Sequence, residues 1–140
     1  MERHIEVIVR GFISREGNVL LCRAKQKKHW YFPGGHVELG ENSRAAFERE
    51  MMEEIGEEIS AGQFMGINEN KFSDAEGEHQ ELNIVFEACL DKEGIGSREE
   101  HLEFCWMNRE EFSGALILPK NMKKAVLKWM EDKKVFHSEQ

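Results

Sequence analysis

The sequence predicts an α/β fold in which a mixed β-sheet packs between helices. Three features support it: apolar and polar alternation near the start, a helical pattern around residues 42–56, and further strands followed by an amphipathic helix over 121–135. The order strand-rich, helix, strand-rich, helix is typical of this class. With 140 residues, 40% of them hydrophobic, we expect one domain spanning residues 1–140.

The first elements form a predicted β-hairpin. Residues 4–13 alternate apolar and polar side chains and are rich in β-branched residues, and residues 19–24, VLLCRA, form a second strand-like run. The Arg-Glu-Gly-Asn stretch between them is typical of a tight turn. After a short apolar piece, Gly34 and Gly35 break the pattern, and two glycines allow a tight loop that a ligand can approach closely.

A short helix follows this glycine pair. Asn42 or Ser43 can cap its start through a side-chain oxygen, and Gly56 can end it in a left-handed conformation. One face is apolar at every fourth position, with Phe47, Met51 and Ile55.

The second half of the chain supplies the rest of the sheet and the last helix. In order, its predicted elements are a strand with a polar break over 62–72, a strand over 81–90, a polar loop over 91–101, a strand over 102–107, a helical turn over 108–112 and an amphipathic helix over 121–135. The last helix directs five side chains toward the core: Met122, Ala125, Val126, Trp129 and Met130.

Composition narrows the class of function. A net charge of −8 argues against nucleic-acid binding through a basic face, although bound cations can still attract a small phosphate ligand. No apolar run approaches 18 residues and no signal-peptide pattern is present, so we expect a cytoplasmic protein without membrane contact. The three cysteines, Cys22, Cys89 and Cys105, lie in strand-like segments and are expected to be buried thiols. The oligomeric state stays open, a homodimer included.

The predicted short helix carries three carboxylates on one side. At 100° per residue, Glu50, Glu53 and Glu54 fall within an arc of roughly 100°. Like charges at these spacings cost a helix a few tenths of a kcal/mol per pair. Carboxylate oxygens are the ligands that Mg²⁺ and Mn²⁺ prefer, and a bound cation reverses that cost. A solvated acidic face is the alternative; the sequence favours a metal site.

Residues 35–57 also carry a family resemblance. They follow the pattern G-x5-E-x7-R-E-M-x-E-E-x-G-E, which resembles the signature of the Nudix (MutT-like) hydrolases. The family pattern ends in a bulky apolar residue where this chain has Glu57; every other position matches. The resemblance implies a Nudix-type α/β/α sandwich with the mixed β-sheet between helices. It also implies a metal-dependent pyrophosphohydrolase that cleaves a diphosphate linkage in a nucleoside diphosphate-X substrate.

The resemblance implies roles for the residues of this signature. Glu50, Glu53 and Glu54 are expected to bind Mg²⁺ or Mn²⁺ and to serve in catalysis. Arg49 is expected to pair with acidic or backbone groups and fix the helix, Glu41 to brace the loop, and Gly56 to support the helix end.

A glutamate from a distant loop often serves such enzymes as base or extra ligand. The polar loop before residue 102 offers Glu99 and Glu100, with Glu103 a weaker candidate, against the alternative of an ordinary charged loop. Glu57 is either a solvated residue or a fourth carboxylate of the site.

Substrate contacts are predicted on the residues that flank the signature. Arg23 is the candidate for holding a phosphate, because a guanidinium forks onto phosphate oxygens, and a plain surface cation is the alternative. Gly34 and Gly35 are expected to let the substrate approach the backbone. Four aromatic residues are candidates for stacking on a base, although core packing is the commoner role of an aromatic in a strand: Trp30, Tyr31, Phe32 and Phe72.

Markers typical of other Nudix subfamilies are missing. ADP-ribose hydrolases commonly have a proline about fifteen residues after the signature, but the only prolines are Pro33 and Pro119. Diadenosine polyphosphate hydrolases commonly have a tyrosine there, but the sole tyrosine is Tyr31. A general nucleoside diphosphate-X hydrolase remains, with nucleoside triphosphates or their damaged forms as the leading candidate substrates. A non-catalytic Nudix-fold sensor of nucleotides or sugar nucleotides is the alternative; such modules often lose signature glutamates, which this chain keeps.

Overall fold

A computed structural model describes residues 4–139. Its elements, in chain order, are β1 (Glu6–Arg15), β2 (Asn18–Ala24), β3 (Gly34–His36), α1 (Ser43–Ile55), β4 (Phe64–Asp74), β5 (Gly77–Cys89), β6 (Leu102–Met107), α2 (Arg109–Gly114), α3 (Lys120–Asp132) and β7 (Phe136–Ser138). The sheet runs β6-β2-β1-β5-β4-β7, with β3 paired to β1 outside this path. The β1–β5 and β4–β7 pairs are parallel and the others antiparallel, so the sheet is mixed, as the sequence predicts.

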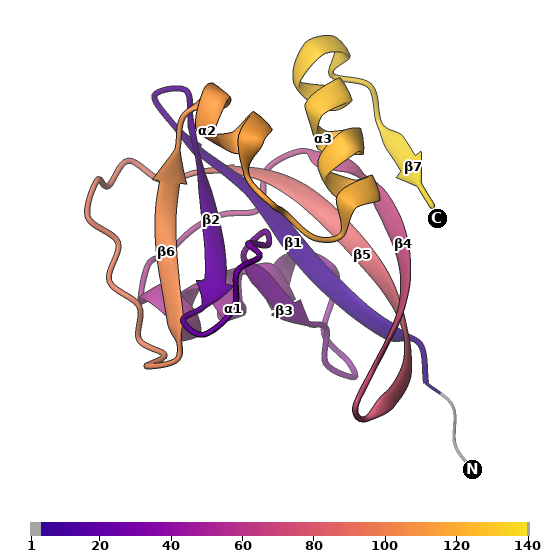
Figure 1. Cartoon of the computed structure of the whole chain (residues 1–140). Coiled ribbons are helices and arrows are strands. Elements are labelled where there is room, and N and C mark those ends of the chain that lie inside the picture. Colours follow the sequence, from indigo (N-terminus) through magenta and orange to yellow (C-terminus); the bar gives the residue numbers. More distant parts are fainter. Residues whose placement is uncertain (1–3, 140) are drawn as a thin grey trace.

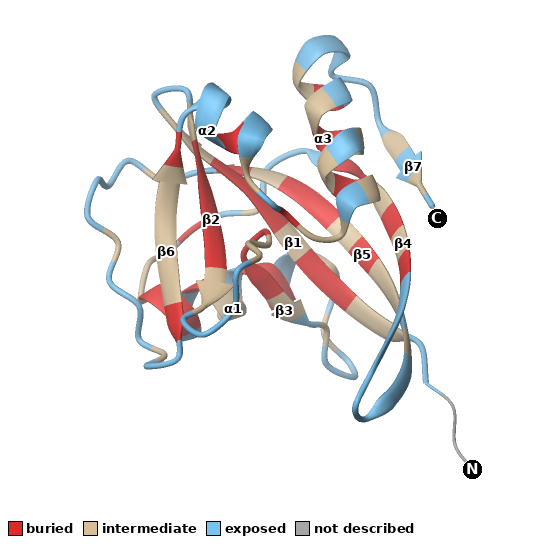
Figure 2. Ribbon diagram, viewed as in Figure 1, coloured by how far each residue is buried: buried red, intermediate tan, exposed pale blue. Residues whose placement is uncertain are grey.

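Helices cover both faces of this sheet, which confirms the predicted α/β arrangement. In Figure 1, α1 lies behind the strands, and α2 and α3 lie in front of them. Alternate residues of β1 serve the two sides: Val9 and Ile13 pack with Phe47 of α1, whereas Phe12 packs with Trp129 of α3. Figure 2 shows the buried positions along the middle of the sheet and the exposed ones on loops and outer helix faces.

The two strands of the first hairpin separate soon after their turn. β1 and β2 pair only at Ser14↔Val19 and Arg15↔Asn18, and farther along β1 pairs instead with β3. The chain between them fills the gap, because Tyr31 bridges to Cys22 and the Gly11 N–H donates to the Pro33 carbonyl at 2.8 Å. This split places the glycine pair in the sheet, next to α1.

Local signals fixed the hairpin turn and the helix ends as expected. Glu16 and Gly17 have φ values of 49° and 83°, the positive pair that a two-residue hairpin loop requires. The Asn42 side chain accepts a hydrogen bond from the Ala45 N–H at 2.9 Å, so Asn42 is the N-cap of α1. Gly56 ends the helix at φ 70°.

Several element predictions were wrong in detail. The glycine pair is not a break but part of β3. The strand predicted over 62–72 has no polar break and is the continuous strand β4. The last helix ends at Asp132 rather than at residue 135. β7 was not predicted. The first strand also extends to Arg15, two residues beyond the predicted end. Cys22 is buried, but Cys89 is exposed and Cys105 intermediate, and all three thiols are free.

No helix within residues 4–139 is long and apolar enough to cross a membrane.

Candidate functional site

The glycine pair brings β3 into close contact with both β1 and α1. A Cβ atom at Gly34 would lie 1.8 Å from the Val9 carbonyl oxygen, and one at Gly35 would lie 2.3 Å from the Glu50 carboxyl carbon. At Gly34 a side chain would clash with the β1 backbone, whereas at Gly35 it would displace the Glu50 carboxylate. The structure thus gives both glycines a packing reason, beside the substrate-binding role predicted for them.

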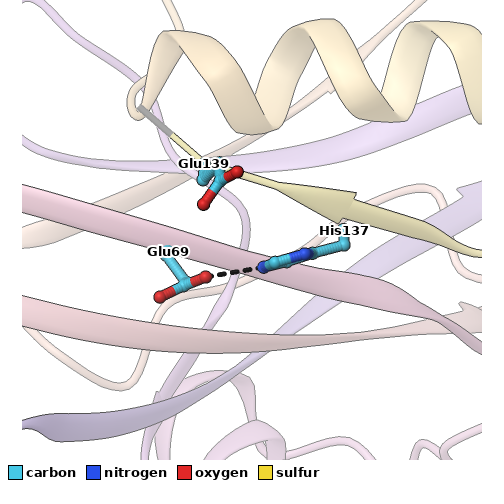
Figure 3. Close-up of side chains that lie close together, drawn as sticks. All are labelled: Glu69, His137 and Glu139. Atoms are coloured by element: carbon cyan, nitrogen blue, oxygen red, sulfur yellow. Dashed lines mark hydrogen bonds and ion pairs between the residues drawn. The ribbon is translucent and has the colours of Figure 1, made fainter.

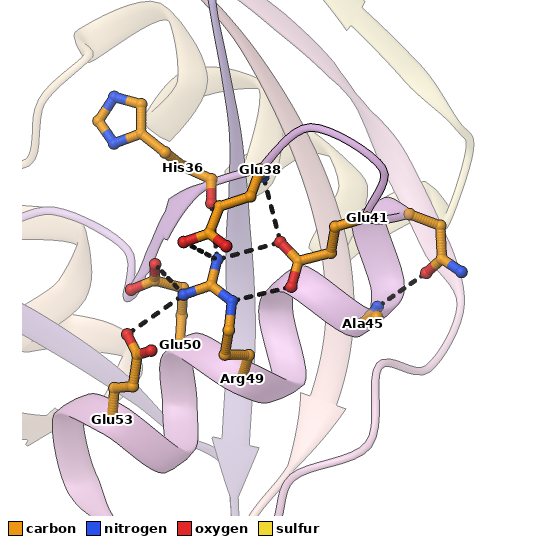
Figure 4. A network of polar contacts seen from close by, with 8 residues as sticks. His36, Glu38, Glu41, Ala45, Arg49, Glu50 and Glu53 are labelled. Carbon is orange, nitrogen blue, oxygen red and sulfur yellow. Dashed lines mark hydrogen bonds and ion pairs between the residues drawn. The ribbon is translucent and has the colours of Figure 1, made fainter.

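Arg49 is the centre of a polar network between α1 and the loop before it (Figure 4). Its guanidinium donates to both Glu41 carboxylate oxygens at 2.8 and 3.1 Å, to Glu50 at 2.9 Å, to Glu53 at 3.2 Å and to the His36 carbonyl at 3.0 Å. Glu41 in turn accepts from the Glu38 N–H at 3.1 Å. The hydrogen bonds from Arg49 lower the pKa of Glu41, so this carboxylate stays charged.

The three acidic residues of α1 differ in their surroundings. The Glu53 side chain is 54% exposed and the Glu50 side chain is 16% exposed. Glu54 is buried, with only 8% of the residue exposed. Burial raises the pKa of Glu50, although Arg49 opposes the shift. The α1 face therefore runs from a solvated carboxylate to a buried one.

Glu54 is the most perturbed acid of this group. Its pKa is raised from 4.5 to about 8, mainly by burial and further by nearby carboxylates, while Arg10 opposes the shift. Its Oε2 atom is buried and has no hydrogen-bond partner among residues 4–139. A buried carboxylate oxygen without a donor is costly unless it is protonated or meets a cation.

The raised pKa of Glu54 predicts a pH-dependent stability in the absence of metal. Between pH 4.5 and about 8 the folded state binds this proton more tightly than the unfolded state, so the free energy of unfolding falls as pH rises across that window. The slope from this one group is at most about 1.4 kcal/mol per pH unit. Denaturant unfolding of chelator-treated wild type and Glu54→Gln should show their stability difference growing across this window. A constant difference would contradict the buried carboxylate.

The loop over 91–101 approaches α1 and brings Glu99 near its acidic face. The Arg98 N–H donates to the Glu54 carbonyl at 2.7 Å, and a Cβ atom at Gly56 would lie 2.4 Å from the Arg98 guanidinium. The charge of Glu99 contributes to the raised pKa of Glu54. Glu99 is partly buried whereas Glu100 is exposed, so of the two predicted residues the fold turns Glu99 toward the site.

Glu57 stands where the family pattern has an apolar residue, and it pairs with Lys92 of the same loop. The Lys92 carbonyl accepts from the Trp106 indole N–H at 3.1 Å. Glu57 therefore links the loop over 91–101 to the end of α1. This ion pair is neither of the two roles that the sequence suggests, a solvated residue or a fourth carboxylate of the site.

Arg23 faces β6 and pairs with Glu103, and its guanidinium lies 4.3 Å from the centre of the Trp30 ring. Arg10 is also engaged, because it donates to the Phe32 carbonyl at 3.1 Å and to Asn83 at 3.3 Å. Both cations come from the separating strands of the first hairpin, and each already has protein partners.

A cavity of about 620 Å³ opens beside this region, large enough for a nucleotide-sized ligand. Of the four aromatic residues predicted as candidates for stacking, Tyr31 and Phe72 line this cavity. Phe32 is buried in the core, and Trp30 packs against that core. Polar groups lie among the remaining lining residues: Arg10, His29, Asn70, Lys71, Glu81, Lys120 and Asn121.

Sequence analysis missed the polar lining of this cavity. Asn70 and Glu81 are paired neighbours on β4 and β5, and the Asn70 amide donates to the Glu81 carboxylate at 3.3 Å. Asn121, the second residue of α3, donates to the Glu69 carbonyl at 3.2 Å. The available signal was the asparagine at two alternate positions of β4, Asn68 and Asn70, both of which are buried.

The donor set suits a hard divalent cation. The three carboxylates of α1, one of them with a buried oxygen, are the donor type that Mg²⁺ and Mn²⁺ prefer, although within residues 4–139 their oxygens do not all lie within 4.8 Å of one another. Glu99 adds a fourth carboxylate from outside the helix. These residues are therefore compatible with a bound cation, whose positive charge would also attract the phosphates of a substrate.

Comparison with known proteins identifies relatives along most of the chain. The family model of the NUDIX domain matches residues 2–132 of the sequence. The chain is 29% identical over 108 residues to the CTP pyrophosphohydrolase of Escherichia coli K12, covering 74% of this chain and 76% of that protein. It is 28% identical over 121 residues to the nucleoside triphosphatase NudI of Salmonella arizonae, covering 76% and 84%. The crystal structure of a MutT protein from Methanosarcina mazei Go1 superposes with a TM-score of 0.77 at 25% identity, covering 96% and 99%.

Proposed function

The chain belongs to the Nudix family of hydrolases, which act on phosphoric anhydride bonds, and on that premise we propose that it is a metal-dependent nucleoside triphosphate pyrophosphohydrolase. The observation that carries the proposal is the acidic face of α1. There the buried Glu54 keeps an unpartnered carboxylate oxygen beside Glu50 and Glu53.

We assign the metal ligands to Glu50, Glu53 and Glu54. Bound by these residues, Mg²⁺ or Mn²⁺ would supply positive charge for a pyrophosphate and would lower the pKa of a bound water. The protein contributes the rigid arrangement, because Arg49 holds two of the carboxylates to the helix surface and Gly35 leaves room for Glu50. Arg49, Glu41 and Gly56 thus act as structural supports of the site.

The proton of the attacking water needs a carboxylate acceptor. We assign this role to Glu99, because its charge acts on Glu54 while its carboxylate belongs to a separate loop. Glu100 is the exposed neighbour and the second candidate. The ties of Glu57 to Lys92 and of the Arg98 N–H to the Glu54 carbonyl hold this loop beside the acidic face.

The nucleotide part of the substrate fits the cavity that Tyr31 and Phe72 line. An aromatic ring can stack on a base, and Asn70 and Asn121 supply amide groups for its polar edge. Arg23 remains our candidate for a substrate phosphate, because a guanidinium has five N–H groups and its contact with Glu103 uses Nε. Gly34 and Gly35 complete the predicted substrate contacts on β3.

Two relatives guide the choice of substrate class. One is named a CTP pyrophosphohydrolase and the other a nucleoside triphosphatase, so we propose nucleoside triphosphates, damaged forms included, as the first class to test. The alternative class, a sensor that binds nucleotides without cutting them, is less well supported because the acidic site is intact.

A release assay tests this function. Purified protein would be incubated with nucleoside triphosphates, ADP-ribose, dinucleoside polyphosphates and sugar nucleotides, each with Mg²⁺, with Mn²⁺ and with chelator. We expect pyrophosphate and a nucleoside monophosphate from at least one triphosphate, with chelator abolishing turnover. No turnover of any compound, together with thermal stabilisation by nucleotides, would support the sensor instead.

A further inference from the structure

A second group of metal-ligating side chains lies at the outer edge of the sheet, where β4 pairs with β7. There Glu69, His137 and Glu139 bring one donor atom each within 4.8 Å of one another (Figure 3). The His137 Nε2 atom lies 2.6 Å from a Glu69 carboxylate oxygen. None of the three belongs to the acidic face of α1 or lines the 620 Å³ cavity.

The strand register itself brings these residues together. β4 and β7 run parallel with Ile67 paired to His137, and successive side chains of a strand alternate between the two faces. Glu69 therefore shares a face with His137, and Glu139 continues that face just beyond β7. The neighbouring Phe136 points to the other side, into the core beneath α3. The cluster follows from the pairing of the backbone rather than from one choice of side-chain rotamer.

This placement is unfavourable without a positive partner. Like charges on adjacent strands destabilise a pair, and Glu69 and Glu139 come together in a chain of net charge −8. His137, the middle residue of the short β7 strand, contacts the Glu69 carboxylate. Carboxylate oxygens and an imidazole nitrogen form a mixed donor set that suits Zn²⁺ and related transition-metal ions.

We propose that Glu69, His137 and Glu139 form a surface site for a divalent transition-metal ion that joins β7 to the sheet. Zn²⁺ holds such donors at about 2.0–2.2 Å, so donors on opposite sides of the ion stand at most about 4.4 Å apart. The three donor atoms lie within 4.8 Å of one another, and small rotations of the half-exposed Glu69 and His137 side chains bring them into that range. The bound ion ties residues that are 68 positions apart in the chain.

A second cluster, Asp74, Glu76 and His79 in the turn between β4 and β5, provides an internal comparison. There Asp74 accepts from the His79 ring and from the Glu76 N–H, both at 2.8 Å, and His79 also lies 3.8 Å from Glu6. Both ring nitrogens of His79 thus face carboxylates. These contacts raise the pKa of His79, chiefly through the hydrogen bond with Asp74, and they already engage both ring nitrogens.

Zinc titration calorimetry tests the proposal in a background that removes competing ligands. The parent chain would carry Glu53→Gln and Glu54→Gln to disable the proposed catalytic site, and Cys89→Ser because Cys89 is an exposed free thiol. We expect one equivalent of Zn²⁺ to bind this parent. Adding His137→Ala should weaken that binding at least about tenfold, the lower end of what even outer ligand partners contribute. Adding His79→Ala, the matched control, should leave it unchanged.

Thermal unfolding gives an independent readout. Zn²⁺ should raise the Tm of the parent and of the His79→Ala chain, because it binds the folded state, but not that of the His137→Ala chain. The proposal is overturned if the parent binds no Zn²⁺, if His137→Ala binds it as tightly as the parent, or if His79→Ala is the variant that loses it. Because catalysis is not measured, these outcomes stand apart from the proposed hydrolase activity.

Discussion

Glu54→Gln is expected to lower kcat by at least about 10²-fold and to leave the metal-free protein as stable as wild type or more stable. The activity loss follows from removing a carboxylate that we assign to the metal, on a scale comparable to losing a catalytic proton-transfer group. The stability effect follows from burial: glutamine has nearly the same shape but does not have to take up a proton on folding, as the buried Glu54 does between pH 4.5 and about 8. A gain in stability with a loss of activity marks a functional residue rather than a packing one.

Steady-state kinetics at saturating Mg²⁺ and chelator-treated denaturant unfolding measure the two effects. Glu53→Gln should lose activity similarly but change stability little, because its side chain is 54% exposed. The matched control is Glu58→Gln, an exposed glutamate just past the helix, which should change neither quantity. Full activity in Glu54→Gln would refute the assigned metal site.

Arg49→Lys is expected to be damaging although it keeps the positive charge. The guanidinium reaches Glu41, Glu50, Glu53 and the His36 carbonyl at once, which a single ammonium group cannot do. Its loss leaves carboxylates on adjacent turns facing one another without their shared donor. We expect the free energy of unfolding to fall by about 1–3 kcal/mol, as for hydrogen bonds to charged groups, and kcat to fall as well.

The matched control for this change lies on the same helix. Arg44 donates to the Ala61 and Gly62 carbonyls, both at 2.7 Å, rather than to carboxylates. Arg44→Lys should therefore keep kcat and cost less stability. If Arg49→Lys behaved like Arg44→Lys in both measurements, the network would not organise the acidic face.

Features that depend on neighbouring residues in sequence were predictable. The N-cap at Asn42, the left-handed end at Gly56 and the core stripe of Phe47, Met51 and Ile55 all rest on local spacing, and the structure confirms each. The mixed sheet between helices followed from the order of these elements.

Features that depend on distant partners were not predictable. β3 and β7 have three residues each and become strands only through pairing with β1 and β4. Asn68 lies in the segment predicted to contain a polar break. Its side-chain amide is buried and forms hydrogen bonds with Asn83 and Ser138, which lie far away in sequence. The pairing of Arg23 with Glu103 likewise follows from the β2–β6 register.

The central claim, that the acidic face of α1 holds the cation, is tested most directly by Mn²⁺ binding. Electron paramagnetic resonance of free Mn²⁺ would be followed as wild type, Glu53→Gln/Glu54→Gln and Glu58→Gln proteins are added. The account predicts that wild type and Glu58→Gln remove free Mn²⁺ from solution and that the double variant binds at least one equivalent less. Equal binding by all three proteins would contradict it and would place the cation elsewhere on the chain.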